Sequence, residues 1–125
     1  MQILIADHQP RVRFALRVAL EQQLSIKTIG EATDAEDVLA QTLATNPNLA
    51  LIEWELPGMP IDDLVGTMRK TCAHLRVIVL NSREETRERA MAAGADAFVC
   101  MCDAPDKLLL MIETYCGQND PGKGG

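Results

Sequence analysis

Residues 48–60 read NLALIEWELPGMP, and this stretch decides the fold that the chain is expected to adopt. It opens with an apolar run, residues 49–52, between Pro47 and the turn-forming pair Pro57-Gly58. A short apolar run with breakers on both sides is typical of a strand buried on both faces of a parallel sheet. Glu53 follows where that strand should end. Function in open α/β sheets gathers at the carboxyl ends of the strands, so Glu53 is a candidate site residue; the alternative is a strand that simply ends in solvent.

Strands and helices are expected to alternate on both sides of this stretch. Short apolar runs predict strands at residues 2–6, 25–32, 49–52, 75–80 and 97–101. Helical spacing and helix-starting residues predict helices at about residues 11–23, 33–46, 62–73, 82–94 and 105–115. This alternation predicts an α/β fold, a doubly wound five-stranded parallel sheet with five helices. Because parallel crossovers are right-handed, helices should cover both faces, and the carboxyl ends of the strands should meet at one edge.

Local signals indicate where individual helices begin and end. Thr33 with Glu36, and Ser82 with Glu85, have the spacing of a capping box, which satisfies backbone donors at a helix start. Gly94 is placed to end the fourth helix, because glycine readily adopts the left-handed conformation found there.

Composition limits the classes of function. The chain has 125 residues and a formal net charge of −6, and direct binding to nucleic acid by this segment is not expected because it would need a basic surface. No apolar run reaches the roughly 20 residues that cross a bilayer, and residues 1–6 lack the basic leader of a secretory signal. We therefore expect a cytoplasmic protein without membrane contact. One domain is expected at residues 1–116, followed by an exposed tail or linker at residues 117–125, GQNDPGKGG.

Cysteine spacing favours reduced thiols. The chain has four cysteines, Cys72, Cys100, Cys102 and Cys116. They lack the paired spacing of zinc sites and the density of a disulfide framework. Cys100 and Cys102 lie near an expected strand end, which leaves a metal or redox role open.

Polar and sulfur-containing side chains follow the strands of the predicted sheet. The residues expected at its carboxyl edge are Asp7, His8, Glu53, Asn81, Ser82, Met101 and Cys102. The chain has no glycine-rich phosphate loop, so a nucleotide site is not indicated.

Four segments carry a resemblance to a known family. They are ILIADHQP at residues 3–10, LIEWELPGMP at 51–60, VIVLNS at 77–82 and GADAFVCMCDAPDKLL at 94–109. In this order they resemble the receiver domain of bacterial two-component response regulators over nearly all of residues 2–113. The likeness is strongest to receivers that precede a helix-turn-helix DNA-binding domain. It implies a flavodoxin-like sheet with strand order 2-1-3-4-5 and a role in signal transduction that controls transcription.

The resemblance also implies a chemistry. Receivers of this family phosphorylate themselves on an aspartate at the end of the third strand. An acidic pair after the first strand holds Mg²⁺, and a hydroxyl after the fourth strand and a lysine after the fifth complete the site. The metal and the lysine neutralise the charge on the phosphoryl oxygens during transfer.

This chain departs from that set at four of the five positions. Glu53 stands at the phosphoacceptor position, and Asp7 is followed by His8 rather than by a second acid. Asn81 stands at the hydroxyl position and Met101 at the lysine position. An imidazole suits Mg²⁺ poorly, and a thioether carries no charge to pair with phosphate. We therefore expect a phosphorylation-independent pseudo-receiver, without enzymatic activity, cofactor or bound metal, that regulates an output domain or partner protein.

Other interpretations of these residues stay open. Glu53 could act as a permanent negative charge in place of an aspartyl phosphate, or it could be drift after loss of function. A protonated His8 could offset the like charges of Asp7 and Glu53. Asp7, His8, Glu53 and Cys102 could together bind a transition metal, which would make the domain a metal or redox sensor. Residual phosphate acceptance by Glu53 is the last alternative.

Apolar residues on the first and last helices suggest an interaction surface. Phe14 and Val18 lie one turn apart and face away from the apolar stripe of the first helix, and Leu110 does the same on the last helix. In the receiver fold these helices cover the same face of the sheet, so we expect a homodimer through Phe14, Val18 and Leu110. The competing surface is the fourth helix, fifth strand and fifth helix, where residues 83–89 are rich in mixed charge.

Overall fold

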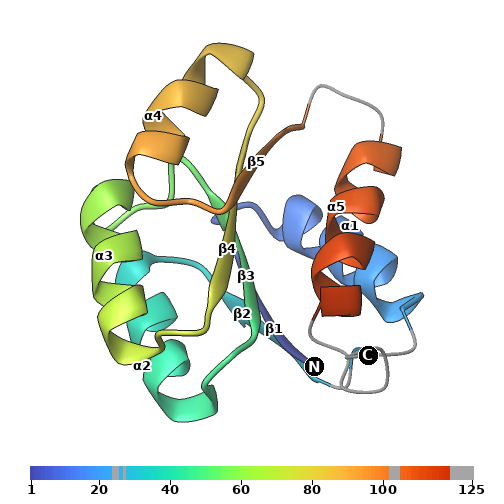
Figure 1. Cartoon of the computed structure of the whole chain (residues 1–125), viewed down its shortest axis with the longest axis horizontal. Coiled ribbons are helices and arrows are strands. Elements are labelled where there is room, and N and C mark those ends of the chain that lie inside the picture. Colours follow the sequence, from blue (N-terminus) through green and yellow to red (C-terminus); the bar gives the residue numbers. More distant parts are fainter. Residues whose placement is uncertain (24–25, 27, 102–104, 119–125) are drawn as a thin grey trace.

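A central sheet lies between two layers of helices in the computed structural model, which describes residues 1–23, 26, 28–101 and 105–118 (Figure 1). Its elements are β1 (Gln2–Ala6), α1 (Pro10–Glu21), β2 (Thr28–Ala32), α2 (Ala35–Thr45), β3 (Leu49–Glu53), α3 (Ile61–Thr71), β4 (Arg76–Asn81), the 3₁₀ turn η1 (Glu84–Thr86), α4 (Arg87–Ala92), β5 (Ala97–Cys100) and α5 (Pro105–Gln118).

The five strands are all parallel and follow the order β2-β1-β3-β4-β5. This order confirms the flavodoxin-like fold that the resemblance implied. β3 lies in the centre, where Leu49 is opposite Ile3 of β1 on one side and Arg76 of β4 on the other. Every residue of β3 is buried, as its uninterrupted apolar run predicts for a strand covered on both faces.

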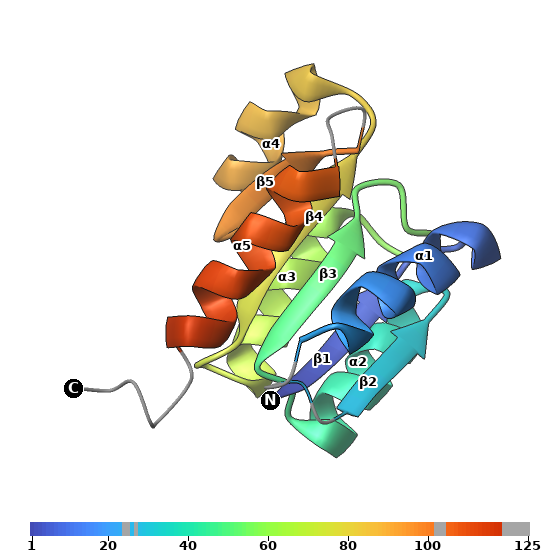
Figure 2. The ribbon, with the colours of Figure 1, turned by 90° about the vertical axis from the view of Figure 1, so that its right-hand side faces the viewer.

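The helices divide between the two faces of the sheet. α1 and α5 cover one face, and α2, α3 and α4 cover the other (Figures 1 and 2). Alternate residues of the strands supply two separate cores, because successive side chains of a strand point to opposite faces. Ile5 and Leu51 pack with Leu16 of α1 and Ile112 of α5, whereas Ile52 belongs to the core under α2, α3 and α4.

The start of α2 differs from the predicted capping box. Asp34, not Thr33, is the N-cap residue, and its carboxylate accepts a hydrogen bond from the backbone N–H of Asp37 at 2.8 Å. Threonine and aspartate are both good N-cap residues, so spacing alone could not distinguish two neighbouring candidates.

The predicted helix at residues 82–94 is also shorter than expected. It consists of η1 (Glu84–Thr86) followed by α4 (Arg87–Ala92), and neither begins with a side-chain cap. The predicted capping box at Ser82 is therefore wrong. Gly94 follows α4 with a φ of 108°, as expected for the residue that ends a helix.

Two other boundaries differ slightly from the sequence-based prediction. The second strand begins at Thr28 rather than at residue 25, which lies outside the described residues. α5 continues to Gln118, two residues past the expected domain boundary at 116. The remainder of the expected tail, residues 119–125, is outside the described residues, so the domain boundary stays a prediction.

The turn after β3 is fixed against α2. Gly58 has a φ of 117°, which L side chains rarely adopt, and a Cβ at this position would lie 2.9 Å from the Cβ of Ala35. The backbone N–H of Ala35 donates a hydrogen bond of 2.8 Å to the carbonyl of Pro57. The Pro57-Gly58 turn thus joins the end of β3 to the start of α2, and this contact positions the residues that follow Glu53.

Candidate functional site

A pocket of about 270 Å³ lies at the carboxyl edge of the sheet. It brings together all five residues expected at the altered phosphoacceptor site, Asp7, His8, Glu53, Asn81 and Met101, together with Ser82. They come from the ends of β1, β3, β4 and β5, which meet here because the strands are parallel. Cys102, the remaining residue expected at this edge, lies outside the described residues.

Two hydrogen bonds join His8 to Glu53. The backbone N–H of His8 donates to Oε2 of Glu53 at 2.9 Å, and Nδ1 of its ring lies 2.5 Å from Oε1. The ring is about half exposed, whereas the Glu53 side chain is 9% exposed. Hydrogen bonding to Glu53 and the nearby negative charge raise the pKa of His8 above 6.5, because both favour the imidazolium form.

Asp7 is buried beside this pair. The backbone N–H of Gln9 donates to its Oδ1 at 2.8 Å, and the guanidinium of Arg13 donates to its backbone carbonyl at 2.9 Å. Burial, followed by hydrogen bonding to the carboxylate of Glu53, raises the pKa of Asp7 from 3.8 to about 7. Removing a carboxylate from water disfavours its ionised form, and a like charge nearby adds to that cost.

The pKa of Glu53 shifts in the opposite direction from that of Asp7. Burial by itself would raise its pKa, but hydrogen bonds from Asp7, the His8 N–H and the His8 ring lower it below 4.5 overall. Two adjacent carboxyl groups titrate as a pair, and the better solvated and better bonded member ionises first. Glu53 is therefore the member of the pair that ionises first, and it accepts both hydrogen bonds from His8.

Asn81 directs its side chain away from Glu53. Its Nδ2 donates to Oγ1 of Thr86 at 2.9 Å, and its Oδ1 accepts from the backbone N–H of Ser82 at 2.7 Å. The amide therefore ties the end of β4 to Thr86, the last residue of η1. Thr86 is 7% exposed and was not expected at this edge, since nothing in its local sequence distinguishes it from a surface threonine.

Met101 completes the edge with an uncharged side chain. It is 40% exposed, and its backbone N–H donates to the carbonyl of Asn81 at 2.7 Å. The position lies beside the pocket, as the family pattern requires of a lysine, but a thioether cannot balance charge on a phosphoryl group.

The donor set of this pocket does not fit Mg²⁺. Asp7, His8 and Glu53 each offer one ligand atom, and these atoms lie within 4.8 Å of one another. Mg²⁺ requires oxygen ligands in a near-octahedral arrangement, whereas one of these three donors is an imidazole nitrogen. Each Glu53 oxygen also accepts a hydrogen bond from His8. The transition-metal hypothesis stays a prediction, because its fourth residue, Cys102, lies outside the described residues.

Cysteine chemistry differs from the expectation at one position. Cys100 is disulfide-bonded, so the prediction of reduced thiols is wrong there. Cys72 is free and buried, and burial raises the pKa of its thiol, which keeps it unreactive.

The three residues of the predicted interaction surface are exposed. The exposed fractions are 69% for Phe14, 45% for Val18 and 63% for Leu110. They lie on α1 and α5, the two helices that cover one face of the sheet (Figure 2). We call these three residues the α1/α5 apolar surface.

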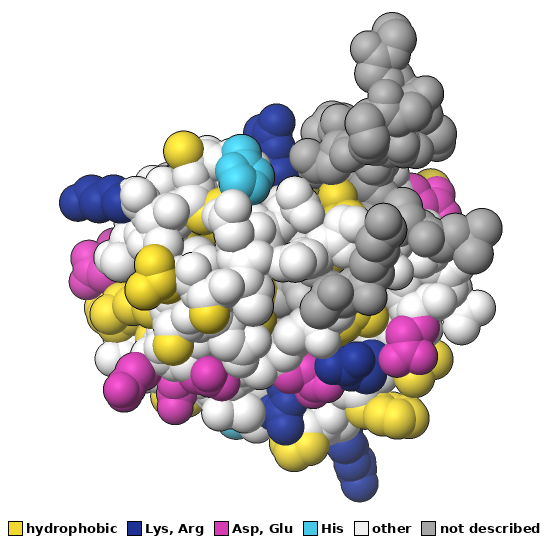
Figure 3. Space-filling view, turned by 90° about the horizontal axis from the view of Figure 1, so that it is seen from below, with side chains coloured by type: hydrophobic (Ala, Val, Ile, Leu, Met, Phe, Trp, Pro, Cys, Tyr) yellow, Lys and Arg dark blue, Asp and Glu magenta, His cyan; other side chains and the backbone are white. Residues whose placement is uncertain are grey.

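The surface carries side chains of both charges, as the composition implies. Where the molecule is seen from the end that carries its N-terminus, Lys and Arg side chains are interspersed with acidic ones (Figure 3). Within the described ranges, no helix combines the length and apolar character needed to cross a bilayer.

Comparison with known proteins identifies one family, which agrees with the observed fold. The family described as "Response regulator receiver domain" matches residues 3–113. The response regulator UvrY of Escherichia coli O157:H7 is 26% identical over 121 residues, which cover 94% of this chain and 56% of UvrY. The transcription regulator of virulence factors BvgA of Bordetella pertussis is 30% identical over 101 residues, which cover 79% of this chain and 48% of BvgA. The chain thus spans about half the length of these relatives.

A solved structure shows the same fold. A two-component response regulator of the LuxR family from Aurantimonas sp. SI85-9A1 superposes with a TM-score of 0.84 at 22% identity, covering 98% of this chain and 91% of that chain. The backbone of that protein therefore has the same fold as this chain.

Proposed function

Because the chain belongs to the response regulator receiver domain family, we propose that it is a receiver whose signalling does not depend on phosphorylation. The observation that carries this proposal is the pair of hydrogen bonds from His8 to Glu53. A phosphoacceptor carboxylate needs an unengaged oxygen aimed at the incoming phosphorus, and both oxygens of Glu53 are engaged with His8. At the lysine position the pocket has Met101, which carries no charge.

In this proposal the ionised Glu53 is a permanent negative charge at the position where other receivers acquire one. An aspartyl phosphate differs in carrying more charge and three acceptor oxygens. The His8 ring, when protonated, offsets part of the Glu53 charge.

The output of such a receiver would be transcriptional. UvrY and BvgA, which are similar to this chain, are named as a response regulator and a transcription regulator, and both are about twice its length. We propose that this domain acts on a DNA-binding output domain or on a partner protein through protein contacts, without touching nucleic acid itself.

The contact surface that we propose is the α1/α5 apolar surface, through which two copies would form a homodimer. The competing surface of α4, β5 and α5 is less suited to intersubunit ion pairs. Its Arg87 already binds Glu84 at 2.5 Å and lies 5.0 Å from the centre of the Phe98 ring. Phe14 and Val18 lie one turn apart on α1, and exposed apolar side chains that lie together more often mark a partner site than single ones do.

A cytoplasmic location belongs to the same proposal, because regulators of transcription act where the DNA is. The disulfide at Cys100 is unusual for a reducing compartment. Alkylation of the protein in a fresh cell lysate, followed by intact mass determination, tests the location: a fully alkylated chain supports it, and a protected disulfide contradicts it.

The central experiment is incubation with Mg²⁺ and a small phosphodonor such as acetyl phosphate, followed by intact mass determination. We expect no phosphoryl adduct under conditions in which a receiver with the full set of site residues is phosphorylated. An adduct that disappears in Glu53→Gln would overturn the proposal and establish residual phosphate acceptance.

A further inference from the structure

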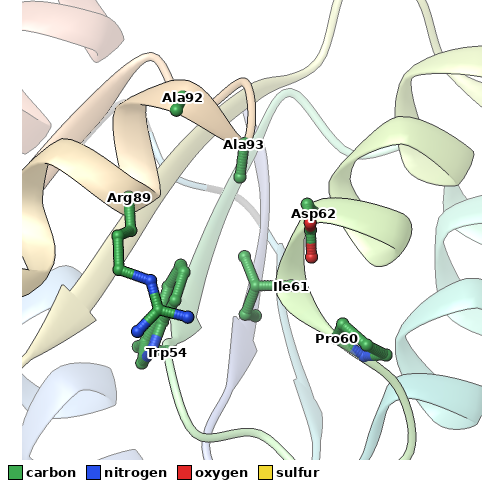
Figure 4. A pocket seen from close by; sticks show the side chains of 7 residues that line it. All are labelled: Trp54, Pro60, Ile61, Asp62, Arg89, Ala92 and Ala93. Atoms are coloured by element: carbon green, nitrogen blue, oxygen red, sulfur yellow. The ribbon is translucent and has the colours of Figure 1, made fainter.

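A second pocket, of about 450 Å³, lies beside α3 and α4 on the face opposite α1 and α5 (Figure 4). Its apolar lining comes from Trp54, directly after β3, from Ile61 at the start of α3 and from two alanines of the α4 end. Two charged side chains, Arg89 and Asp62, complete it. The lining is thus about equally polar and apolar, and the volume is in the range of small-molecule sites.

Arg89 lies against the indole of Trp54. Its guanidinium carbon is 5.2 Å from the centre of the Trp54 ring, within the range of a cation–π interaction. Among the described residues, Arg89 makes no hydrogen bond through its side chain and no ion pair. The indole thus holds a guanidinium whose N–H donors are available to an anionic group, for which their planar geometry suits a carboxylate.

Asp62 supplies the opposite charge. It lies in the first turn of α3, is exposed, and within the described part of the chain forms no side-chain hydrogen bond or ion pair. Arg89 and Asp62 are not bonded to each other, although both line the same pocket. Figure 4 shows them on opposite sides of Ile61, so a cation and an anion stand at two ends of an apolar floor.

We propose that this pocket binds a small zwitterion with an apolar body, of the amino-acid or dipeptide class. Its carboxylate would bind the Arg89 guanidinium, its ammonium group would bind Asp62, and its apolar body would cover Ile61 and the exposed part of Trp54. A zwitterion can pair with both pocket charges and a ligand with one charge can pair with only one, which is why the zwitterion is favoured over a simple anion.

The site goes beyond the proposed function and does not depend on it. It lies outside the pocket of Asp7, His8 and Glu53, and it could bind ligand whether or not Glu53 accepts phosphate. The two pockets share only Trp54, which follows Glu53 in the chain and lines both of them.

Ligand binding can be followed by the fluorescence of Trp54, because Trp54 is the single tryptophan of the chain. The purified protein is titrated with L-phenylalanine and with L-leucyl-L-leucine while Trp54 fluorescence is excited selectively. Calorimetric titration of the same samples gives an affinity that does not depend on the fluorescence baseline. We expect saturable binding in the millimolar range or tighter, with a change in Trp54 emission.

Two variants and one control define the expected contacts. Arg89→Met and Asp62→Asn should each weaken binding by at least about tenfold, since each removes a charged hydrogen-bond partner. Arg83→Met removes an arginine that does not line the pocket and should leave the affinity unchanged. Phenylacetate and phenethylamine, which each carry one charge, should bind at least about tenfold more weakly than L-phenylalanine.

Three results would overturn the proposal. They are the lack of saturable binding by either zwitterion up to about 10 mM, an unchanged affinity in Arg89→Met, and equal binding of phenylacetate and L-phenylalanine. Phosphorylation of Glu53 would contradict the proposed function and leave this result unaffected, so the two failures are distinguishable.

Discussion

At the residue scale, the decisive feature is the distribution of protons among Asp7, His8 and Glu53. Asp7 has a pKa raised to about 7, mainly by burial, whereas the hydrogen bonds that Glu53 receives lower its pKa. His8 has a raised pKa because it binds the same carboxylate. The three side chains form one hydrogen-bonded unit in which each pKa depends on its neighbours.

The first prediction concerns Asp7→Asn. A carboxyl group whose pKa is raised from 3.8 to about 7 on folding stabilises the native state fully below pH 3.8, and this contribution is lost as pH rises through about 7. Asparagine keeps the hydrogen-bonding shape without ionising. Asp7→Asn should therefore be more stable than the wild type by about 1–3 kcal/mol near pH 8, with little difference near pH 4.

This prediction is checked by denaturant unfolding at both pH values in buffer that contains a chelator. A variant that is less stable than the wild type at the higher pH would contradict a protonated Asp7. Glu53 contributes in the opposite sense, because its lowered pKa gives stability that is lost as pH falls through that value, and this contribution is present in both proteins near pH 8.

The second prediction concerns the protonation of His8. Its pKa should lie above 6.5 in the wild type and should move toward 6.5 in Glu53→Gln, where the negative charge is removed. The measurement is an NMR titration of the imidazole in a His74→Gln background, so that one histidine signal remains. A His8 pKa at or below 6.5 in the wild type would contradict the bonding that we describe.

The sequence predicted which residues meet at this edge but not how they bond. Parallel strands place their carboxyl ends together, so Asp7, His8, Glu53, Asn81 and Met101 could be assigned to one site from strand order alone. Which carboxyl group holds the proton depends on burial and on distances between residues about 45 positions apart. The bond from Asn81 to Thr86 was missed because it depends on a 3₁₀ turn that the capping-box spacing did not predict.

At the element scale, the turn after β3 holds the end of that strand, and therefore Glu53, against α2. Gly58 combines a positive φ with close contact to Ala35 of α2. An added methyl group would strain the backbone and displace α2 at the same time.

Our third prediction compares two glycines. Gly58→Ala should destabilise the protein by about 1–3 kcal/mol, because alanine is strained at positive φ and its Cβ would crowd Ala35. Gly66→Ala is the matched control: Gly66 lies inside α3, and a Cβ there meets nothing within 4 Å. It should stabilise by about 0.5–1 kcal/mol through helix propensity. Thermal and denaturant unfolding measure both values, and equal effects of the two substitutions would contradict the constraint at Gly58.

Our fourth prediction concerns the α1/α5 apolar surface. Phe14→Asp and Leu110→Asp should each convert the expected homodimer to a monomer, because a charge would be buried in the contact. Leu43→Asp is the control, since Leu43 is 76% exposed on α2, at the opposite face of the sheet. Light scattering coupled to size-exclusion chromatography gives the mass. A monomeric wild type, or loss of the dimer in Leu43→Asp, would contradict this interface.

The sequence was a better guide to elements than to their ends. Apolar runs and helical spacing predicted five strands and five helices in the correct order, because burial on one or both faces imposes those periods. Ends depend on single hydrogen bonds, so Asp34 rather than Thr33 begins α2. The contact of Arg89 with Trp54 was not foreseen, because the two residues are 35 positions apart and share no local pattern.

At the scale of the whole molecule, the sheet separates two working faces. The face of α1 and α5 carries the exposed apolar surface, and the face of α2, α3 and α4 carries the pocket with Trp54 and Arg89 (Figure 1). β3 lies between these two faces, and its last residue, Glu53, stands at the carboxyl edge of the sheet. A ligand on one face and a partner on the other could therefore occupy the domain together.

The fifth prediction concerns metal content. Protein purified without chelator should contain no stoichiometric Mg²⁺ or transition metal, because a metal would have to displace the two hydrogen bonds that join His8 to Glu53. Elemental analysis of the intact protein provides the measurement. Stoichiometric zinc, copper or nickel that is lost in His8→Ala would support the metal-sensor hypothesis instead.

The bonds between His8 and Glu53 also restrict how this sequence can evolve. Shortening Glu53 to aspartate, the smallest step toward phosphotransfer, withdraws the carboxylate by one methylene and breaks both bonds before any chemistry is gained. Changing His8 to an acid instead would place a third carboxyl group beside Asp7 and Glu53. Neither single substitution supplies the uncharged Met101 position with a cation, so we expect neither to introduce phosphate acceptance by itself.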